Sequence, residues 1–291
     1  MAEQVIATLP AARERQGVRM WRRFRRQPLP MTGLVLVGLF LLLAIFGPLV
    51  TTDPAATNFD NVLAPPSLAH WFGTDDLGRD ALARLATGAR ISLTAGVLST
   101  LLAMLVGIPI GLVAGYYRRW VDPILMRGVD VVLAFPFLIF AVGLAAILGP
   151  SLRNVVLALG ISQIPGVVRI ARGETLALRQ EDFVAGAIAD GAGDGVILFR
   201  YILPNAANAL IVQATVAIPV AIIGEATLSF LGLGVQPPTP SWGVMLTDAQ
   251  QFLSQAPWLA VWPGVLIALA TLGFNLLGDG LRDVLDPRGA R

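Results

Sequence analysis

The chain has 291 residues, of which 55% are hydrophobic and 14% are charged. Soluble domains carry about 25% charged residues, so the composition predicts a membrane protein. The sequence contains no lysine, no cysteine and a single histidine, His70, which excludes a phosphate-loop ATPase, a thiolate nucleophile, a Cys-ligated metal and a His-rich metal site.

Apolar runs long enough to cross a bilayer, which takes about 20 residues, follow one another along the chain. Arg169 would reach the interface by snorkelling at the end of the fourth run, and the third could start near Ile124 if Arg127 does the same. The predicted spans are 28–52, a stretch within 91–117, 131–152, 154–171, 206–225 and 257–278. The predicted fold is therefore an all-α integral membrane protein with six transmembrane helices.

Arginines gather on one side of these spans. Seventeen fall in 1–27, 118–130, 169–201 and after 278, and four fall in the segments on the other side. The positive-inside rule then predicts that both termini are cytoplasmic. The first apolar run exceeds the usual 7–15 residues of a cleaved signal peptide and no A-x-A site follows it, so we expect it to remain as a span.

The long outer segment 53–90 contains a helix signal in "GTDDLGRDALARLATGARISL", residues 73–93. Thr74 or Asp75 could cap a helix with an acidic start. Leucines at 77, 82 and 85 would form its apolar side. We expect a surface helix lying on the outer leaflet.

The inner segment 173–204 breaks the apolar pattern with "DGAGDGVILFRYILPN". Apolar residues before it share one face of a short helix, and Gly191 and Gly193 interrupt that helix before a second apolar stripe begins. The first face comprises Phe183, Val184, Ala187 and Ile188. Such a segment either fits a groove on another protein or is an ordinary interfacial loop.

Glu225 is isolated within an apolar stretch, with 23 uncharged residues before it and 22 after it. A charge near the bilayer centre costs about 2.5–3.5 kcal/mol on insertion scales. Three roles remain open for Glu225: a passage or gate, a structural hydrogen bond to backbone, or a place at the interface.

The inner segment resembles the cytoplasmic coupling loop of ABC importer permeases, whose pattern is E-A-A, three residues, Gly, nine residues, I-x-L-P. Gly191, Leu203 and Pro204 match that pattern at the right spacing. Ala185 stands in place of the glutamate, Gly186 in place of the second alanine, and the first isoleucine position is also changed.

Three further stretches resemble the C-type permease of dipeptide and oligopeptide importers. They are residues 73–93, "EATLSFLGLGVQPPTPSWG" at 225–243 and "NLLGDGLRDVLDPR" at 275–288. The resemblance covers 28–288. It implies a type I ABC importer permease in which the first span and the outer loop precede a five-helix core, 91–278, followed by a cytoplasmic tail, 279–291.

The resemblance implies a non-catalytic transport subunit in the plasma (inner) membrane of a prokaryote. Its expected partners are a second homologous permease, two cytosolic ABC ATPase subunits that bind the ATP and Mg²⁺, and an extracytoplasmic peptide-binding protein, with no nucleic acid. No catalytic residue, metal site or cofactor is expected in this chain. The residues expected to couple it to the ATPases are Phe183, Val184, Ala185, Gly186, Ala187, Gly191, Leu203 and Pro204.

On the outer side, the candidates for docking the binding protein are Asp75, Asp76, Arg79 and Asp80. The leading function is uptake of di- and oligopeptides. An ion-coupled secondary transporter would embed more carboxylates or histidines than Glu225 alone. An intramembrane enzyme would need more than the lone His70. An ABC importer of another small solute, such as nickel, is the remaining alternative.

Overall fold

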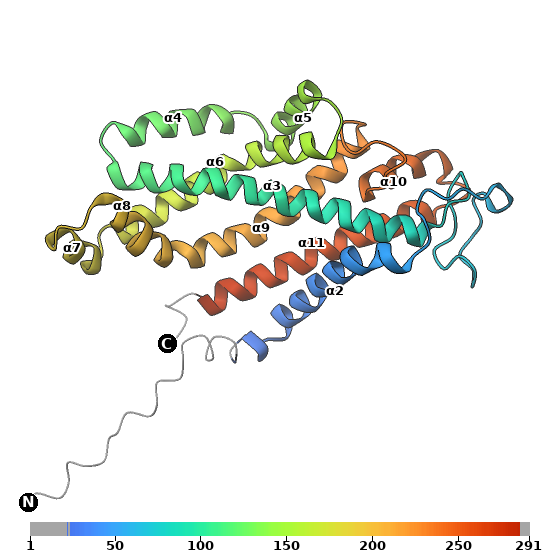
Figure 1. Cartoon of the computed structure of the whole chain (residues 1–291), viewed down its shortest axis with the longest axis horizontal. Coiled ribbons are helices and arrows are strands. Elements are labelled where there is room, and N and C mark those ends of the chain that lie inside the picture. The colour runs from blue at the N-terminus through green and yellow to red at the C-terminus, as the bar shows by residue number, and fades with distance from the viewer. Residues whose placement is uncertain (1–21, 23, 286–291) are drawn as a thin grey trace, which may run out of the picture.

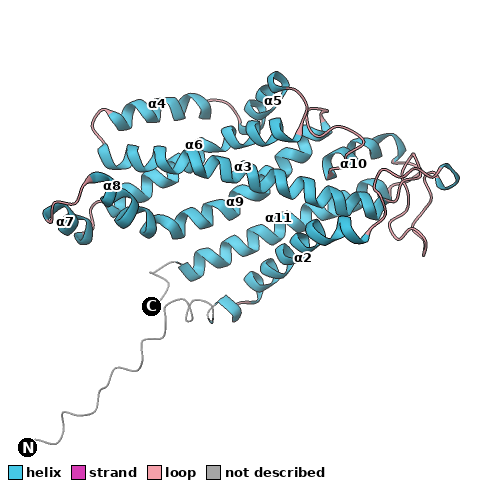
Figure 2. Cartoon of the chain, viewed as in Figure 1, coloured by secondary structure: helices cyan, strands magenta, loops and turns pink. Residues whose placement is uncertain are grey.

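The structure is a computed structural model that describes residue 22 and residues 24–285. The described chain is built of helices and loops (Figure 2). Most of the basic tail 1–27 and the end of the tail 279–291 lie outside the described residues. Five helices in the described part are long and apolar enough to cross a membrane. They are α2 (Pro28–Val50), α3 (Ala81–Tyr117), α6 (Leu152–Leu178), α9 (Leu203–Phe230) and α11 (Trp258–Leu285).

The third predicted span, 131–152, is wrong as a straight helix. The chain forms α4 (Val121–Leu133) and α5 (Phe137–Leu148), two helices bent by 84° at a short break. Pro136 causes the break, because it has no backbone N–H to donate and disfavours helical geometry in the residue before it. Counting this bent pair as one span gives the sixth crossing among the described residues.

The predicted surface helix is also corrected. The first helix after the outer loop begins at Ala81 and runs without interruption to Tyr117. Asp80 is its N-cap and accepts a hydrogen bond from the Ala83 N–H at 3.0 Å, whereas Thr74 and Asp75 lie in the loop that precedes it. Residues 81–93 are therefore the outer end of span α3 and form no separate element on the leaflet.

Helices α3 and α6 form the centre of the bundle (Figure 1). Gly107, Gly111 and Gly115 lie one turn apart on α3, and a Cβ built on each would come within 2.8, 2.5 and 2.7 Å of a side-chain atom of α6. The atoms approached belong to Val167, Ala171 and Thr175, in the same order. The two helices therefore run in the same direction at a separation that only glycine permits on this face.

The first span packs beside the core. Helix α2 lies against α11 and the outer half of α3 (Figure 1). A Cβ on Gly33 would meet backbone atoms of Leu277 at 2.5 Å and Gly273 at 2.8 Å. Phe40 joins the cluster of buried side chains that fills the outer half of the bundle around Trp242.

Short helices occupy the two ends of the bundle, which are called outer and inner after the predicted topology. At the outer end, α10 (Trp242–Ala249) and a 3₁₀ turn η3 (Gln250–Phe252) connect the last two spans, and a second 3₁₀ turn η1 (Phe59–Asn61) lies in the first loop. At the inner end, α7 (Asp182–Ala189), α8 (Asp194–Val196) and a π-helical turn η2 (Ile197–Ile202) lead into α9.

The close contact of Gly111 with Ala171 predicts that one added methyl group destabilises the protein. Gly111→Ala places a Cβ 2.5 Å from the Ala171 Cβ, so the free energy of unfolding should fall by ~1–3 kcal/mol through overpacking. Gly38→Ala is the matched control, because a Cβ at Gly38 of α2 meets no atom within 4 Å. Thermal unfolding of the purified protein in detergent measures both, and equal midpoints for the two variants would contradict the tight contact.

Candidate functional site

The inner end of the bundle carries the residues expected to couple the chain to an ATPase. The four apolar side chains of α7 were expected on one face, but in the structure two are buried and two are exposed. Val184 and Ala187 are buried and pack in one cluster with Leu112 of α3 and Ile202. The side chains on the other side, Phe183 and Ile188, are 40% and 50% exposed. Helix α7 is thus anchored by one face and presents the other to solvent.

Gly191 ends α7. Its φ is +77°, a left-handed conformation that L side chains rarely adopt. The Gly191 N–H donates to the Ile188 carbonyl and the Ala192 N–H to the Ala187 carbonyl, each at 3.0 Å. This is the Schellman pattern of helix C-termini, in which glycine occupies the left-handed position. The matched glycine of the motif is therefore required by backbone geometry.

A hydrogen bond fixes the second half of the segment to α3. The Tyr116 hydroxyl donates to Asp194 Oδ1 at 2.8 Å, and the Arg179 guanidinium lies 5.2 Å from the centre of the Tyr116 ring. Sequence reasoning missed this contact, because Tyr116 lies 78 positions before Asp194. The α8 end of the α7–α8 segment is thus attached to α3, while α7 packs against the η2 turn.

The remaining motif residues lie at two places. Ala185 and Gly186 are exposed on α7, beside Phe183, and a Cβ added to Gly186 would meet no atom within 4 Å. Leu203 is partly buried against the α7 cluster and Pro204 is exposed in the first turn of α9. Small residues thus leave open space beside the exposed Phe183.

Glu225 is completely buried where α9 meets α3 and the outer connection. Its Oε2 accepts a hydrogen bond from the Ser92 hydroxyl and its Oε1 one from the Ser229 hydroxyl, both at 2.7 Å. Ser92 Oγ also accepts the backbone N–H of Trp242 at 3.3 Å. Of the three roles left open for Glu225, these contacts favour a structural one, with serine hydroxyls as donors in place of backbone N–H groups.

Trp242 completes this connection. Its indole Nε1–H donates to the Leu85 carbonyl at 3.2 Å, and the side chain has no exposed surface. The Phe40 ring packs edge-on against it at 5.8 Å between centroids. Glu225 and Trp242 together join three helices, α3, α9 and α10, close to the outer end of the bundle.

The buried Glu225 carboxylate predicts that its substitution lowers the stability of the protein. Glu225→Gln replaces one acceptor oxygen by an amide that donates, so one serine hydroxyl loses its acceptor and stability should fall by ~1–3 kcal/mol. Thr227→Val is the control, because the exposed Thr227 hydroxyl bonds to the Ile223 carbonyl of its own helix and its loss should be mild. If the two variants have the same midpoint of thermal unfolding, the serine contacts do not hold the outer end together.

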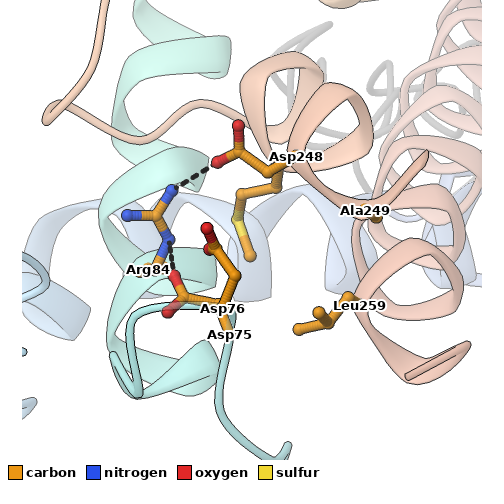
Figure 3. A pocket seen from close by; sticks show the side chains of 7 residues that line it. Asp75, Asp76, Arg84, Asp248, Ala249 and Leu259 are labelled. Atoms are coloured by element: carbon orange, nitrogen blue, oxygen red, sulfur yellow. Dashed lines mark hydrogen bonds and ion pairs between the residues drawn. The ribbon is translucent and has the colours of Figure 1, made fainter. Parts of the chain in front are cut away.

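The outer end also contains a network of ion pairs (Figure 3). Asp75 Oδ2 lies 2.6 Å from Arg79 Nε and 3.2 Å from Arg84 Nε, and all three side chains are buried. Arg84 Nη2 reaches Asp248 Oδ2 of α10 at 3.1 Å. Burial raises the pKa of Asp248 above its ordinary value, and the charge of Arg84 opposes that rise. The network ties the first outer loop to α3 and α10.

The four docking candidates thus have different surroundings. Asp75 and Arg79 are enclosed by this network and have little exposed surface. Asp76 is the more open residue, with a side chain 34% exposed and 3.5 Å from Arg79. Asp80 caps α3 and its Oδ2 lies 2.9 Å from His70 Nδ1. Contact of these residues with a binding protein stays a prediction.

Removing the Asp75 carboxylate from this network should lower the stability of the protein. Asp75→Asn leaves Arg79 and Arg84 buried beside a neutral amide, and breaking a buried ion pair destabilises by ~3–5 kcal/mol. The half-exposed neighbour Asp76→Asn should change stability by ~1 kcal/mol or less. Chemical or thermal unfolding of the detergent-purified protein compares the two, and equal effects would show that the network does not stabilise this end.

Two ion pairs join α4 to α6. Arg172 makes a bidentate contact with Asp122, with both N–O distances at 2.6 Å, and Arg169 lies 2.9 Å from Asp130. Sequence reasoning placed Asp122 in an inner loop and Asp130 either in that loop or at the start of the third span, and it did not predict the pairs. Elsewhere in the described residues, no three His, Cys, Asp or Glu side chains gather as a metal site.

The fold defines a polytopic helical membrane protein whose α7–α8 segment presents exposed apolar side chains at one end of the bundle. Residues 107–291 match the family described as the binding-protein-dependent transport system inner membrane component, and residues 16–66 match the N-terminal TM domain of oligopeptide transport permease C. The chain belongs to this family of binding-protein-dependent inner-membrane transport components. It is a non-catalytic permease of an ABC importer and a multi-pass plasma membrane protein, which excludes the secondary transporter.

Curated relatives match along most of their length. The chain is 46% identical over 269 residues to the dipeptide transport system permease protein DppC of Alkalihalophilus pseudofirmus, covering 92% of this chain and 88% of the relative. It is 45% identical over 290 residues to the glutathione transport system permease protein GsiD of Pectobacterium atrosepticum, covering 98% and 96%. GsiD of Escherichia coli is 47% identical over 270 residues, covering 92% and 89%.

Proposed function

We propose that this permease moves di- and oligopeptides into the cell and forms their pathway together with a second, homologous permease. The names of its relatives support a peptide substrate, because one is a dipeptide permease and others are permeases for glutathione, which is itself a tripeptide. The match of residues 16–66 to an oligopeptide permease domain points to the same substrate class.

The energy for transport comes from partner subunits. Family membership implies ATPase and substrate-binding partners. The chain contains no lysine to build a phosphate loop, so the two ATPases bind ATP and Mg²⁺ and this subunit holds no cofactor. An extracytoplasmic peptide-binding protein delivers the substrate to the outer end.

The α7–α8 segment is the element that contacts the ATPases. Phe183 and Ile188 project from a short helix whose opposite face is buried, and the small residues between them leave room for a partner's surface. The Tyr116–Asp194 hydrogen bond attaches the segment to α3. A displacement of the segment by an ATPase is therefore passed directly to the membrane core.

The same proposal implies an orientation in the membrane. With the α7–α8 segment facing the cytosol, both termini are cytoplasmic, as the arginine distribution predicts. A membrane-impermeant thiol reagent added to intact cells should label Thr57→Cys and Thr239→Cys but not Gln180→Cys. Labelling of Gln180→Cys from outside would contradict this topology.

Reconstitution tests the proposed substrate. The permease pair, the ATPases and the binding protein in proteoliposomes should accumulate radiolabelled dialanine when ATP is present, and omission of this chain should abolish uptake. Nickel is the comparison solute. ATP-dependent uptake of nickel without uptake of dialanine or glutathione would overturn the peptide assignment.

Gly191 and Gly186 separate backbone strain from added volume at the coupling segment. Gly191→Leu forces a side chain onto a left-handed residue, with a strain of ~1–2 kcal/mol, and should abolish ATPase docking or its stimulation by substrate. Gly186→Leu adds the same volume on exposed α7 without that strain. Gly193→Leu is the control, since Gly193 has φ −68° and open space around it.

Pull-down of the ATPases, followed by ATP turnover in the reconstituted complex, measures all three variants. We expect Gly193→Leu to dock and turn over ATP at close to the unmodified level. Normal docking and stimulation of both Gly191→Leu and Gly186→Leu would mean that this segment does not couple the subunits.

A further inference from the structure

The ion pair between Asp130 of α4 and Arg169 of α6 is exposed. The two side chains are each 55% exposed, although they lie 2.9 Å apart. Both belong to the membrane-crossing part of the chain, α6 being a candidate span and α4 the first half of the bent pair. Ionisable groups in such segments face a water-filled cavity or a protein partner, because exposure to hydrocarbon is costly.

The depth of the pair follows from two contacts with α6. Asp130 reaches Arg169, nine residues before the inner end of the helix at Leu178. On the other side of the bend, Ala141 of α5 packs in one cluster with Leu159, seven residues after the outer end at Leu152. The bend between α4 and α5 therefore lies beside the middle of α6.

The backbone at this bend is a second and independent observation. Ala134, Phe135 and Pro136 are all exposed, and Pro136 interrupts the hydrogen-bond ladder because it lacks an N–H. Non-helical backbone at membrane depth is tolerated where it is buried in protein or lines a water-filled cavity, but not where it faces lipid. Asp130 and Ala134, the first residue of the bend, are one helical turn apart, at the end of α4.

We propose that Asp130, Arg169 and the bend at Ala134–Pro136 line the water-filled path through the permease, and that the ion pair binds the charged ends of the passing peptide. This inference rests on the proposed peptide substrate. A small peptide carries an ammonium and a carboxylate, which match the Asp130 carboxylate and the planar Arg169 guanidinium. When no peptide is present, Asp130 and Arg169 pair with each other. A passing peptide replaces that pair with two new contacts, its ammonium to Asp130 and its carboxylate to Arg169.

Cysteine labelling tests the path. The chain has no cysteine, so single replacements report without background from this subunit. Ala134→Cys lies one turn from Asp130 and leaves both charges in place. Leu39→Cys is the control, because Leu39 is 57% exposed at the centre of α2. A water-soluble thiosulfonate should label position 134 faster than position 39 by roughly tenfold or more, since thiols in lipid stay protonated and dry.

Uptake of dialanine by the reconstituted complex tests the binding of peptide ends. Asp130→Asn and Arg169→Gln should each lower uptake by roughly tenfold, the loss expected for one charged hydrogen bond. Arg153→Gln is the matched control, because Arg153 is exposed in the first turn of the same helix, α6. ATP turnover stimulated by the binding protein should persist in all three variants.

The outcomes are separable. Labelling at position 134 no faster than at position 39 would show a face covered by lipid or by the second permease, and would overturn the path. Fast labelling with unchanged uptake in both charge variants would overturn the binding of peptide ends. An unmodified complex that takes up no dialanine contradicts the proposed substrate, while the labelling contrast still decides whether the path holds water.

Discussion

The close packing of α3 on α6 is the constraint on which the rest of the structure depends. Gly107, Gly111 and Gly115 allow the two backbones to approach, and the register that they set fixes the helices that follow. In lipid there is no hydrophobic force to drive two apolar helices together, so van der Waals contact over small residues and buried hydrogen bonds must hold the bundle. The ion pairs of α4 with α6 and the packing of α9 against both helices form on this central unit.

Polar groups are concentrated at the two ends of α3, where they hold connections in place. At the outer end, Glu225 and its serines join α3 to α9 and α10, and the Asp75–Arg84 network adds the first loop. At the inner end, Tyr116 holds the α7–α8 segment through Asp194. Glu225, Arg84 and Asp194 each have a partner on another element, namely Ser92, Asp248 and Tyr116. The segments at both ends are therefore positioned by tertiary contacts as well as by their own helix propensity.

The sequence predicted what local patterns determine. Apolar run length located five of the crossings, and a glycine before an apolar stripe predicted the end of α7 at Gly191. The bend at Pro136 was not predicted, because hydropathy does not show in which direction the chain continues after a break in a helix. The continuous helix from Ala81 was not predicted, because the sequence pattern does not distinguish an N-cap at Asp75 from one at Asp80. Ser92, one of the two partners of Glu225, and Tyr116, the partner of Asp194, lie 133 and 78 positions away, beyond the reach of any periodicity.

The uninterrupted course of α3 has a mechanical consequence. Thirty-seven residues in one helix make a rod of roughly 55 Å, longer than the hydrocarbon thickness of a bilayer. One end is attached to the first loop and α10 through Arg84, and the other end to the α7–α8 segment through Tyr116. A rod clamped at both ends cannot tilt at one surface alone. Under the proposed function, the arrival of substrate outside and the closure of nucleotide sites inside would act on opposite ends of this one helix.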